Sequence, residues 1–314
     1  MYFVGRRIVI TLITLLLVSV LTFCAFSIIP GDRALLALGI EATDEQVEAM
    51  RAELGLDRSL PVQYFSWLGG FLSGSLGNSS RFRGASITGL VLERMPVTAV
   101  LGALSLAFTL LISIPAVLLS VKREGSFADR LMNTLTAFNI SLPGFFLGVL
   151  FIWIFGLILR LFTPGNYIHY TEDVGGFLGC LLFPALAIAV PNAAIVIKFL
   201  RASVFRELRG DYVRTAQSKG NTRRRALYRH VLKNAVIPAI TLLGMIIGEV
   251  FSGSIVIEQV FTIPGIGRLL IASITSRDYP LVQTLVVYIA FIVVLANTLV
   301  DIVIQLIDPR IRIG

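Results

Sequence analysis

Six long runs of apolar residues leave this chain little choice of fold. An α-helix needs about 20 apolar residues to cross the hydrocarbon core of a bilayer. Six segments provide them: 8–29, 97–121, 131–159, 177–197, 235–257 and 279–307. Hydrophobic residues make up 56% of the 314 residues and charged residues only 15%, whereas about a quarter of a soluble domain is charged. The sequence therefore predicts an all-α integral membrane protein with six transmembrane helices, and it excludes a soluble enzyme.

Prolines lie within several of these segments. Pro115, Pro184 and Pro191 each fall inside an apolar run, and Pro143 followed by Gly144 falls inside the third. Membrane helices tolerate proline where neighbouring groups satisfy the freed backbone, so each segment is expected to form one span. The first segment is expected to be a retained span, because it exceeds the roughly 7–15 apolar residues of a signal peptide.

The distribution of basic residues predicts how the spans are oriented. Lys and Arg gather in the cytoplasmic loops of membrane proteins. If the N-terminus is cytoplasmic, 18 of the 27 basic residues fall on the inner side and 9 on the outer side. Both termini are therefore predicted to be cytoplasmic. The chain then divides into an N-terminal helix, an extracytoplasmic segment, a transmembrane domain with one large inner loop, and a tail, at 1–29, 30–96, 97–307 (loop 198–234) and 308–314.

The extracytoplasmic segment 30–96 is long enough to have structure of its own. Helical periodicity runs through 44–54, and Thr43 with Gln46 three residues later forms a capping-box pattern. We expect a small ordered subdomain here.

The inner loop accounts for all of the chain's excess positive charge. The chain has a net charge of +8, and residues 198–233 hold eleven basic residues against two acidic ones. Gly220 is placed to end a short helix, since glycine readily adopts the left-handed conformation. Thr222 can cap a second helix that carries Leu227 and Val231 on one side. Two short helices joined at a glycine suit a soluble partner, whereas attraction to lipid headgroups explains the charge alone; the residues by themselves leave both interpretations open.

Residues 211–220, DYVRTAQSKG, resemble the cytoplasmic loop of ATP-binding-cassette (ABC) importer permeases. Ala216 and Gly220 match the last alanine and the glycine of the family's EAA-type motif. Arg214 and Thr215 replace the usual glutamate and alanine, which is typical of the peptide and nickel branch. Further matches follow in order along the chain, at 30–32 (PGD), 54–57 (LGLD), 264–267 (PGIG) and 277–280 (RDYP). The resemblance thus covers nearly the whole chain.

This resemblance implies a type I ABC importer permease that forms half of a membrane pathway for short peptides. It implies a second homologous permease, one or two ABC ATPase subunits and an extracytoplasmic substrate-binding protein, all at the inner membrane of a bacterium or archaeon, and no nucleic acid. The loop residues that would dock on the ATPase are Asp211, Arg214, Ala216, Gly220 and Arg223. No cofactor is expected on this chain, with ATP and magnesium held by the partners. The sequence agrees, because none of its four lysines follows a glycine as a P-loop requires.

The fifth span carries the candidate residues for the translocation path. A carboxylate inside a span is unfavourable by roughly 2.5–3.5 kcal/mol, so Glu249 either contacts a substrate amine or metal cation, or serves helix packing. Ser252 lies in a stripe of small residues with Gly244 and Gly248, a spacing that allows close helix approach. A nickel or metal-chelate importer and an ATP-independent secondary transporter or channel are the alternatives. No metal site is predicted, since the two histidines fall on opposite faces of the membrane.

Overall fold

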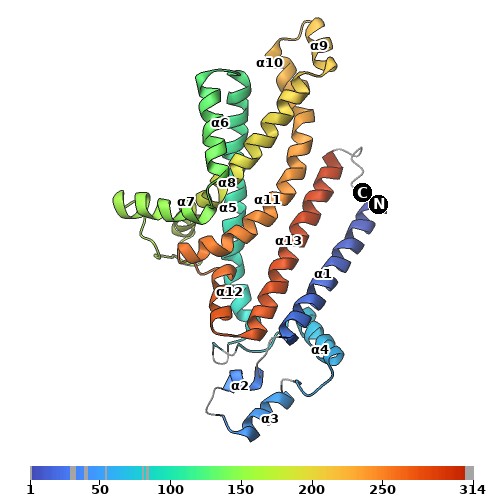
Figure 1. The fold of residues 1–314 in the computed structure, drawn as a ribbon, viewed down its shortest axis with the longest axis vertical. Coiled ribbons are helices and arrows are strands. Elements are labelled where there is room, and N and C mark those ends of the chain that lie inside the picture. The colour runs from blue at the N-terminus through green and yellow to red at the C-terminus, as the bar shows by residue number, and fades with distance from the viewer. Residues whose placement is uncertain are drawn as a thin grey trace. The chain divides into compact units, whose positions relative to one another are not determined.

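The computed structural model describes residues 2–28, 33–38, 42–53, 55–79, 81–82 and 85–307. These residues form helices, and the described ranges hold no strand beyond an isolated bridge between Asn78 and Ser86, so the predicted all-α class is confirmed. The helices (Figure 1) are, in order, α1 (Tyr2–Ile28), α2 (Arg33–Leu38), α3 (Asp44–Glu53), α4 (Leu60–Ser73), α5 (Ile87–Lys122), α6 (Phe127–Ile140), α7 (Gly144–Phe151), η1 (Ile152–Ile158), α8 (Val174–Leu208), α9 (Asp211–Ser218), α10 (Arg223–Ala226), η2 (Leu227–Val231), α11 (Leu232–Val260), α12 (Ile266–Thr275) and α13 (Tyr279–Ile307).

Five of the six predicted spans correspond to single helices that are long and apolar enough to cross a membrane. Those stretches are Gly5–Ile28, Ile87–Lys122, Val174–Leu208, Leu242–Val260 and Tyr279–Ile302. The prediction that proline is tolerated holds in α8, where Pro184 and Pro191 lie inside a continuous helix. At 1.5 Å per residue the 36 residues of α5 measure about 54 Å, which exceeds a hydrocarbon core of roughly 30 Å.

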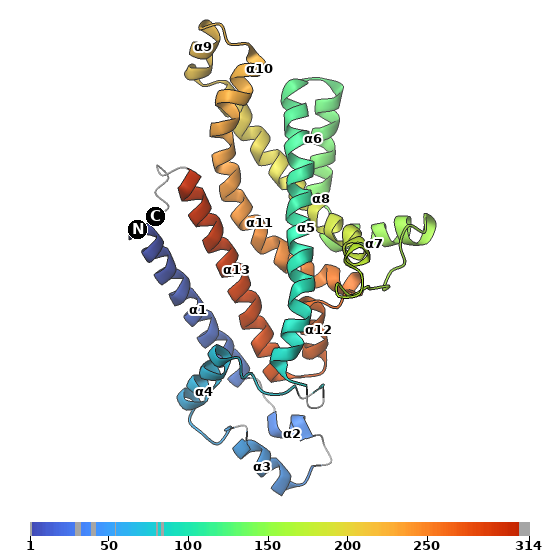
Figure 2. The ribbon, with the colours of Figure 1, turned by 180° about the vertical axis from the view of Figure 1, so that it is seen from behind.

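The third predicted span, 131–159, corresponds to a bent pair of helices and not to one straight helix, and it makes the sixth span if the pair is counted as one. α6 ends at Ile140, and the pair formed by α7 and η1 begins at Gly144, bent by 104° from α6. Figure 2 shows α7 leaving the end of α6 sideways. Pro143 lacks an N–H and disfavours helical backbone in the residue before it, so the chain turns at this position. The 14 residues of α6 reach only about 21 Å.

The chain divides into two compact units, each with its own packing. The first comprises Met1–Thr98 and Pro264–Leu295, and the second comprises Ala99–Ile263 and Ala296–Gly314. In the first unit α1 and α4 meet through aromatic rings, with Phe23 5.4 Å from Tyr64 between centroids. The predicted capping box is confirmed there: Thr43 N donates to Gln46 Oε1 at 3.0 Å, and Gln46 N to Thr43 Oγ1 at 3.4 Å.

A buried aspartate joins distant segments of the first unit. Asp278, fully buried before α13, accepts hydrogen bonds from Ser79 Oγ and from the backbone N–H groups of Arg81 and Leu281. Arg81 also donates from its guanidinium to the Ala272 carbonyl of α12 at 3.0 Å. The loop before α5 is therefore fixed to the junction of α12 and α13.

The second unit is built around α8, which packs against α6, α7 and α11. Much of α8 is buried, including Leu181, Ala185 and Val204. Glycine allows close helix approach to α11: a Cβ at Gly148 of α7 would lie 3.0 Å from the Ile257 side chain.

The predicted division of the chain at 29/30, 96/97 and 307/308 stays a prediction. The tail 308–314 lies outside the described residues, as do the matches at 30–32 and at Leu54.

Candidate functional site

The loop predicted to meet a partner forms a compact tip on the second unit. α9 and α10 lie beyond the ends of α8 and α11, which lead into and out of them (Figure 1). Gly220 has φ +86°, as predicted. Gly220 N donates to Gln217 O at 2.9 Å and Asn221 N to Ala216 O at 3.2 Å, which is the hydrogen-bond pattern of the Schellman motif. Two short helices joined at Gly220 are therefore confirmed.

The start of α9 is held against the end of α8. A Cβ at Gly210 would lie 2.8 Å from the Tyr212 ring, so the turn requires a residue without a side chain. Tyr212 donates from its hydroxyl to Glu207 Oε2 at 2.7 Å. Burial and the hydrogen bond to Glu207 raise the pKa of the Tyr212 phenol above its usual value of 10.0, so the donor stays protonated.

The second half of the tip is anchored by capping and burial. Thr222 Oγ1 accepts from Arg225 N at 3.2 Å, which confirms the predicted cap. Leu227 and Val231 are both buried, also as predicted. The Lys122 ammonium at the end of α5 lies 5.7 Å from the centroid of the Tyr228 ring. Hence the end of α5 contacts the second half of the tip.

The predicted docking residues lie mostly on the outer surface of α9. Val213 is buried and fixes the helix, whereas Asp211, Arg214 and Gly220 are exposed and Ala216 is half-buried. Asp211 and Arg214 approach to 3.9 Å, but their side chains are 99% and 79% exposed, so this ion pair adds little to stability. Arg223 begins α10, and its side chain is not among those described. Docking by these residues stays a prediction.

The predicted path residues share one face of α11. Glu249 and Ser252 are exposed, and Met245 and Val256 continue the same face at helical spacing, 68% and 45% exposed. Glu258 was missed by sequence reasoning, because the predicted span ended one residue before it. It is fully buried within α11, and its position directly after an apolar run was the available signal.

A cavity of about 340 Å³ lies elsewhere in the second unit, between the loop that follows η1, the start of α8 and the end of α11. Phe162 stacks on Phe183 with ring centroids 4.6 Å apart and on Phe261 at 6.0 Å. Glu249 and Ser252 do not line this cavity. Among the described residues, no cluster of His, Cys, Asp and Glu side chains is arranged to hold a metal ion.

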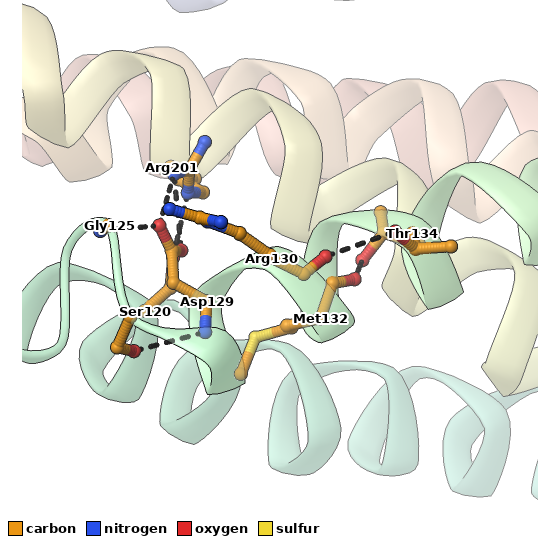
Figure 3. A network of polar contacts seen from close by, with 9 residues as sticks. Ser120, Gly125, Asp129, Arg130, Met132, Thr134 and Arg201 are labelled. Atoms are coloured by element: carbon orange, nitrogen blue, oxygen red, sulfur yellow. Dashed lines mark hydrogen bonds and ion pairs between the residues drawn. The ribbon is translucent and has the colours of Figure 1, made fainter.

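A part-buried ion pair close to the tip was also missed by sequence reasoning. Arg201 of α8 donates from Nη2 to both carboxylate oxygens of Asp129, at 3.1 and 3.0 Å, and from Nε to Ser120 Oγ at 2.7 Å. Ser120 Oγ donates to Asp129, as does Gly125 N at 3.1 Å. Figure 3 shows the Asp129 carboxylate facing Arg201 and Gly125. Ser126 followed three residues later by an aspartate indicated a capped helix start, but nothing indicated Arg201 as the partner.

Five helices long and apolar enough to cross a membrane, together with a bent helix pair, define a multi-pass membrane protein. The chain belongs to the family described as binding-protein-dependent transport system inner membrane component, whose model matches residues 109–313. A model of the N-terminal part of such components matches residues 1–102. The predicted family and the type I permease fold are thereby confirmed, and the chain is a transport subunit without catalytic activity of its own.

Relatives match over nearly the full length of the chain. A probable peptide ABC transporter permease of Sinorhizobium fredii is 35% identical over 99% of both chains. A putative peptide permease of Brucella ovis is 35% identical over 98% of both. The oligopeptide transport system permease AppB of Bacillus subtilis is 32% identical over 99% of both.

Proposed function

We propose that this chain is one of two related permease subunits of an ABC importer for di- and oligopeptides. The observation that carries the proposal is the full-length similarity to proteins named as peptide permeases. If the chain matched such relatives only in its membrane helices, the similarity would indicate a shared fold and no more. Here the extracytoplasmic part and the tip match as well, because the aligned region covers 98–99% of this chain.

The proposed complex contains one or two ATPase subunits, which bind ATP and magnesium and dock on the tip formed by α9 and α10. Support comes from the shape and chemistry of the tip. Its polar outer surface carries Asp211, Arg214 and Gly220, and it is held rigidly from within by Val213, Leu227 and other buried residues. A preorganised surface binds a partner with a smaller loss of conformational entropy than a flexible loop.

The proposed orientation places the tip and both termini in the cytoplasm of a bacterium or archaeon, with the binding protein on the outer side. Support is the two-to-one excess of basic residues on that side of the spans. The substrate pathway runs between this chain and the second permease. The exposed face of α11 that carries Glu249 and Ser252 is proposed to line it, because a carboxylate exposed on a span requires a polar neighbour.

Uptake into proteoliposomes tests the proposal. The chain is reconstituted with a second permease, ATPases and a binding protein from the same organism, and labelled dipeptide, labelled pentapeptide and radioactive nickel are offered in turn. Peptide accumulation that requires both ATP and the binding protein is the expected result. Nickel uptake without peptide uptake would indicate a metal importer instead. Uptake by this chain alone, driven by an ion gradient, would indicate a secondary transporter.

A further inference from the structure

The part-buried group of Ser120, Asp129 and Arg201, here called the clasp, joins three helices at one point. Ser120 belongs to α5, Asp129 to α6 and Arg201 to α8. A single guanidinium reaches the other two helices, and it also lies 4.7 Å from the centroid of the Phe205 ring. The guanidinium is therefore held by hydrogen bonds at its edge and by the Phe205 ring at its face. If any of the three helices slides, a charge-assisted hydrogen bond breaks.

The clasp lies directly before the tip along α8. Arg201 stands seven residues before Leu208, the end of α8, which is about 10 Å at helical rise. Only Arg209 and Gly210 separate α8 from α9. Glu207 and Tyr212 join the two helices, and the Lys122 ammonium of α5 lies 5.7 Å from the centroid of the Tyr228 ring in η2. Whatever fixes α5 and α8 to each other therefore also fixes the tip.

The clasp also connects the tip to the bent helix pair. Asp129 lies in the first turn of α6, whose other end turns into α7 at Pro143. α7 packs on α8 and α11, and Gly148 approaches α11 closely. A displacement of the tip is thus carried into α6 through the clasp, and from α6 into the helices that pack on α7.

We infer that the clasp of Ser120, Asp129 and Arg201 is a positioning element that makes the tip and the α5–α6 hairpin move as one body, and so couples ATP hydrolysis to transport. The transport part of this inference rests on the proposed function. Arginine is needed at position 201 because lysine, a point charge on a flexible stem, cannot donate to Ser120 and both Asp129 oxygens in one plane. Asp129 is almost fully buried, 5% exposed against 26% for Arg201, so solvent cannot replace the lost contacts.

The test compares Arg201→Lys with Arg206→Lys, a matched control on the same helix whose side chain is exposed. Hydrogen exchange of residues 211–218 is measured on the full chain in nanodiscs. Arg201→Lys is expected to speed exchange there by about fivefold or more, and Arg206→Lys by less than about twofold. Exchange that is unchanged in Arg201→Lys, or raised equally in every helix, would overturn the inference.

The second readout is the amount of peptide imported per ATP hydrolysed by the reconstituted complex. Arg201→Lys is expected to lower this ratio by about fivefold while basal ATP hydrolysis persists; a purely structural role would lower both activities together and leave the ratio unchanged. An unchanged ratio overturns the inference. If Arg201→Lys fails to fold, the same two measurements are made on Ser120→Ala, for which smaller changes in the same direction are expected. If the wild-type complex imports no peptide, the proposed function is refuted. The positioning role is then still tested by the hydrogen exchange of Arg201→Lys against Arg206→Lys.

Discussion

Gly220 allows the backbone of the tip and its docking surface to be tested separately. Its φ of +86° is unfavourable for a residue with a side chain, and a Cβ added there meets no atom within 4 Å. Gly220→Ala therefore changes the backbone term alone, which is about 1–2 kcal/mol against the left-handed conformation. This corresponds to an equilibrium population of the two-helix tip, with Gly220 in the left-handed conformation, that is lower by about 5–30-fold. Gly220→Asn should have a smaller effect, since asparagine tolerates this conformation.

Gly220→Trp adds bulk to the same backbone change. If the tip docks on an ATPase, Trp is expected to abolish the stimulation of ATP hydrolysis by loaded binding protein, while Ala only reduces it and Asn reduces it least. The assay is ATP hydrolysis by the reconstituted complex, with membrane insertion checked in parallel. Gly74→Ala is the control, because Gly74 has φ +75° and equal free space outside the tip. Equal stimulated rates for the Trp and Ala variants would refute docking, and an Asn variant weaker than Ala would refute the backbone argument.

Three further predictions concern stability and protonation. Gly148→Leu should lower the unfolding temperature, because even a Cβ there lies 3.0 Å from an α11 side chain and overpacking is unfavourable by about 1–3 kcal/mol; Gly253→Ala, with nothing within 4 Å, should not lower it. Asp278→Asn should reduce the free energy of unfolding by about 1–3 kcal/mol in a denaturant titration, because the fully buried carboxylate accepts three hydrogen bonds; an unchanged midpoint contradicts this. The pKa of Tyr212 is raised by burial and by Glu207, so its contribution to stability is present below pH 10 and is lost as the pH rises through the raised pKa. The tyrosinate absorbance of wild type minus Tyr212→Phe should therefore titrate with a midpoint above pH 10, and a midpoint at or below pH 10 counts against the hydrogen bond.

The short-range signals of the sequence predicted the tip well. Gly220 and Thr222 act within a few residues of themselves, one through its backbone freedom and the other through a cap to the nearby N–H of Arg225. Such interactions depend little on the rest of the molecule. The same holds for the apolar runs, whose length alone makes a helix the only economical way to satisfy backbone hydrogen bonds in lipid.

Prolines show where local signals fail. Pro184 and Pro191 lie inside the continuous helix α8, but Pro143 separates two helices that meet at 104°. In sequence all three sit within apolar runs. Whether a helix continues through proline depends on the neighbours that satisfy the freed carbonyls and on the space for the bend, and a following glycine was too weak a signal to decide it.

The sequence by itself determined the number and length of the apolar segments, the concentration of charge in one loop and the two-helix form of the tip. Tertiary structure alone decided which side chains are buried and which residues contact one another. Glu249 and Glu258 lie nine residues apart on α11, hence on opposite faces, and only packing made the first exposed and the second buried. Asp129 and Arg201 are 72 positions apart. They pair because α8 packs on α6 and brings them together. Once Asp129 is buried, leaving its charge unpaired would be unfavourable.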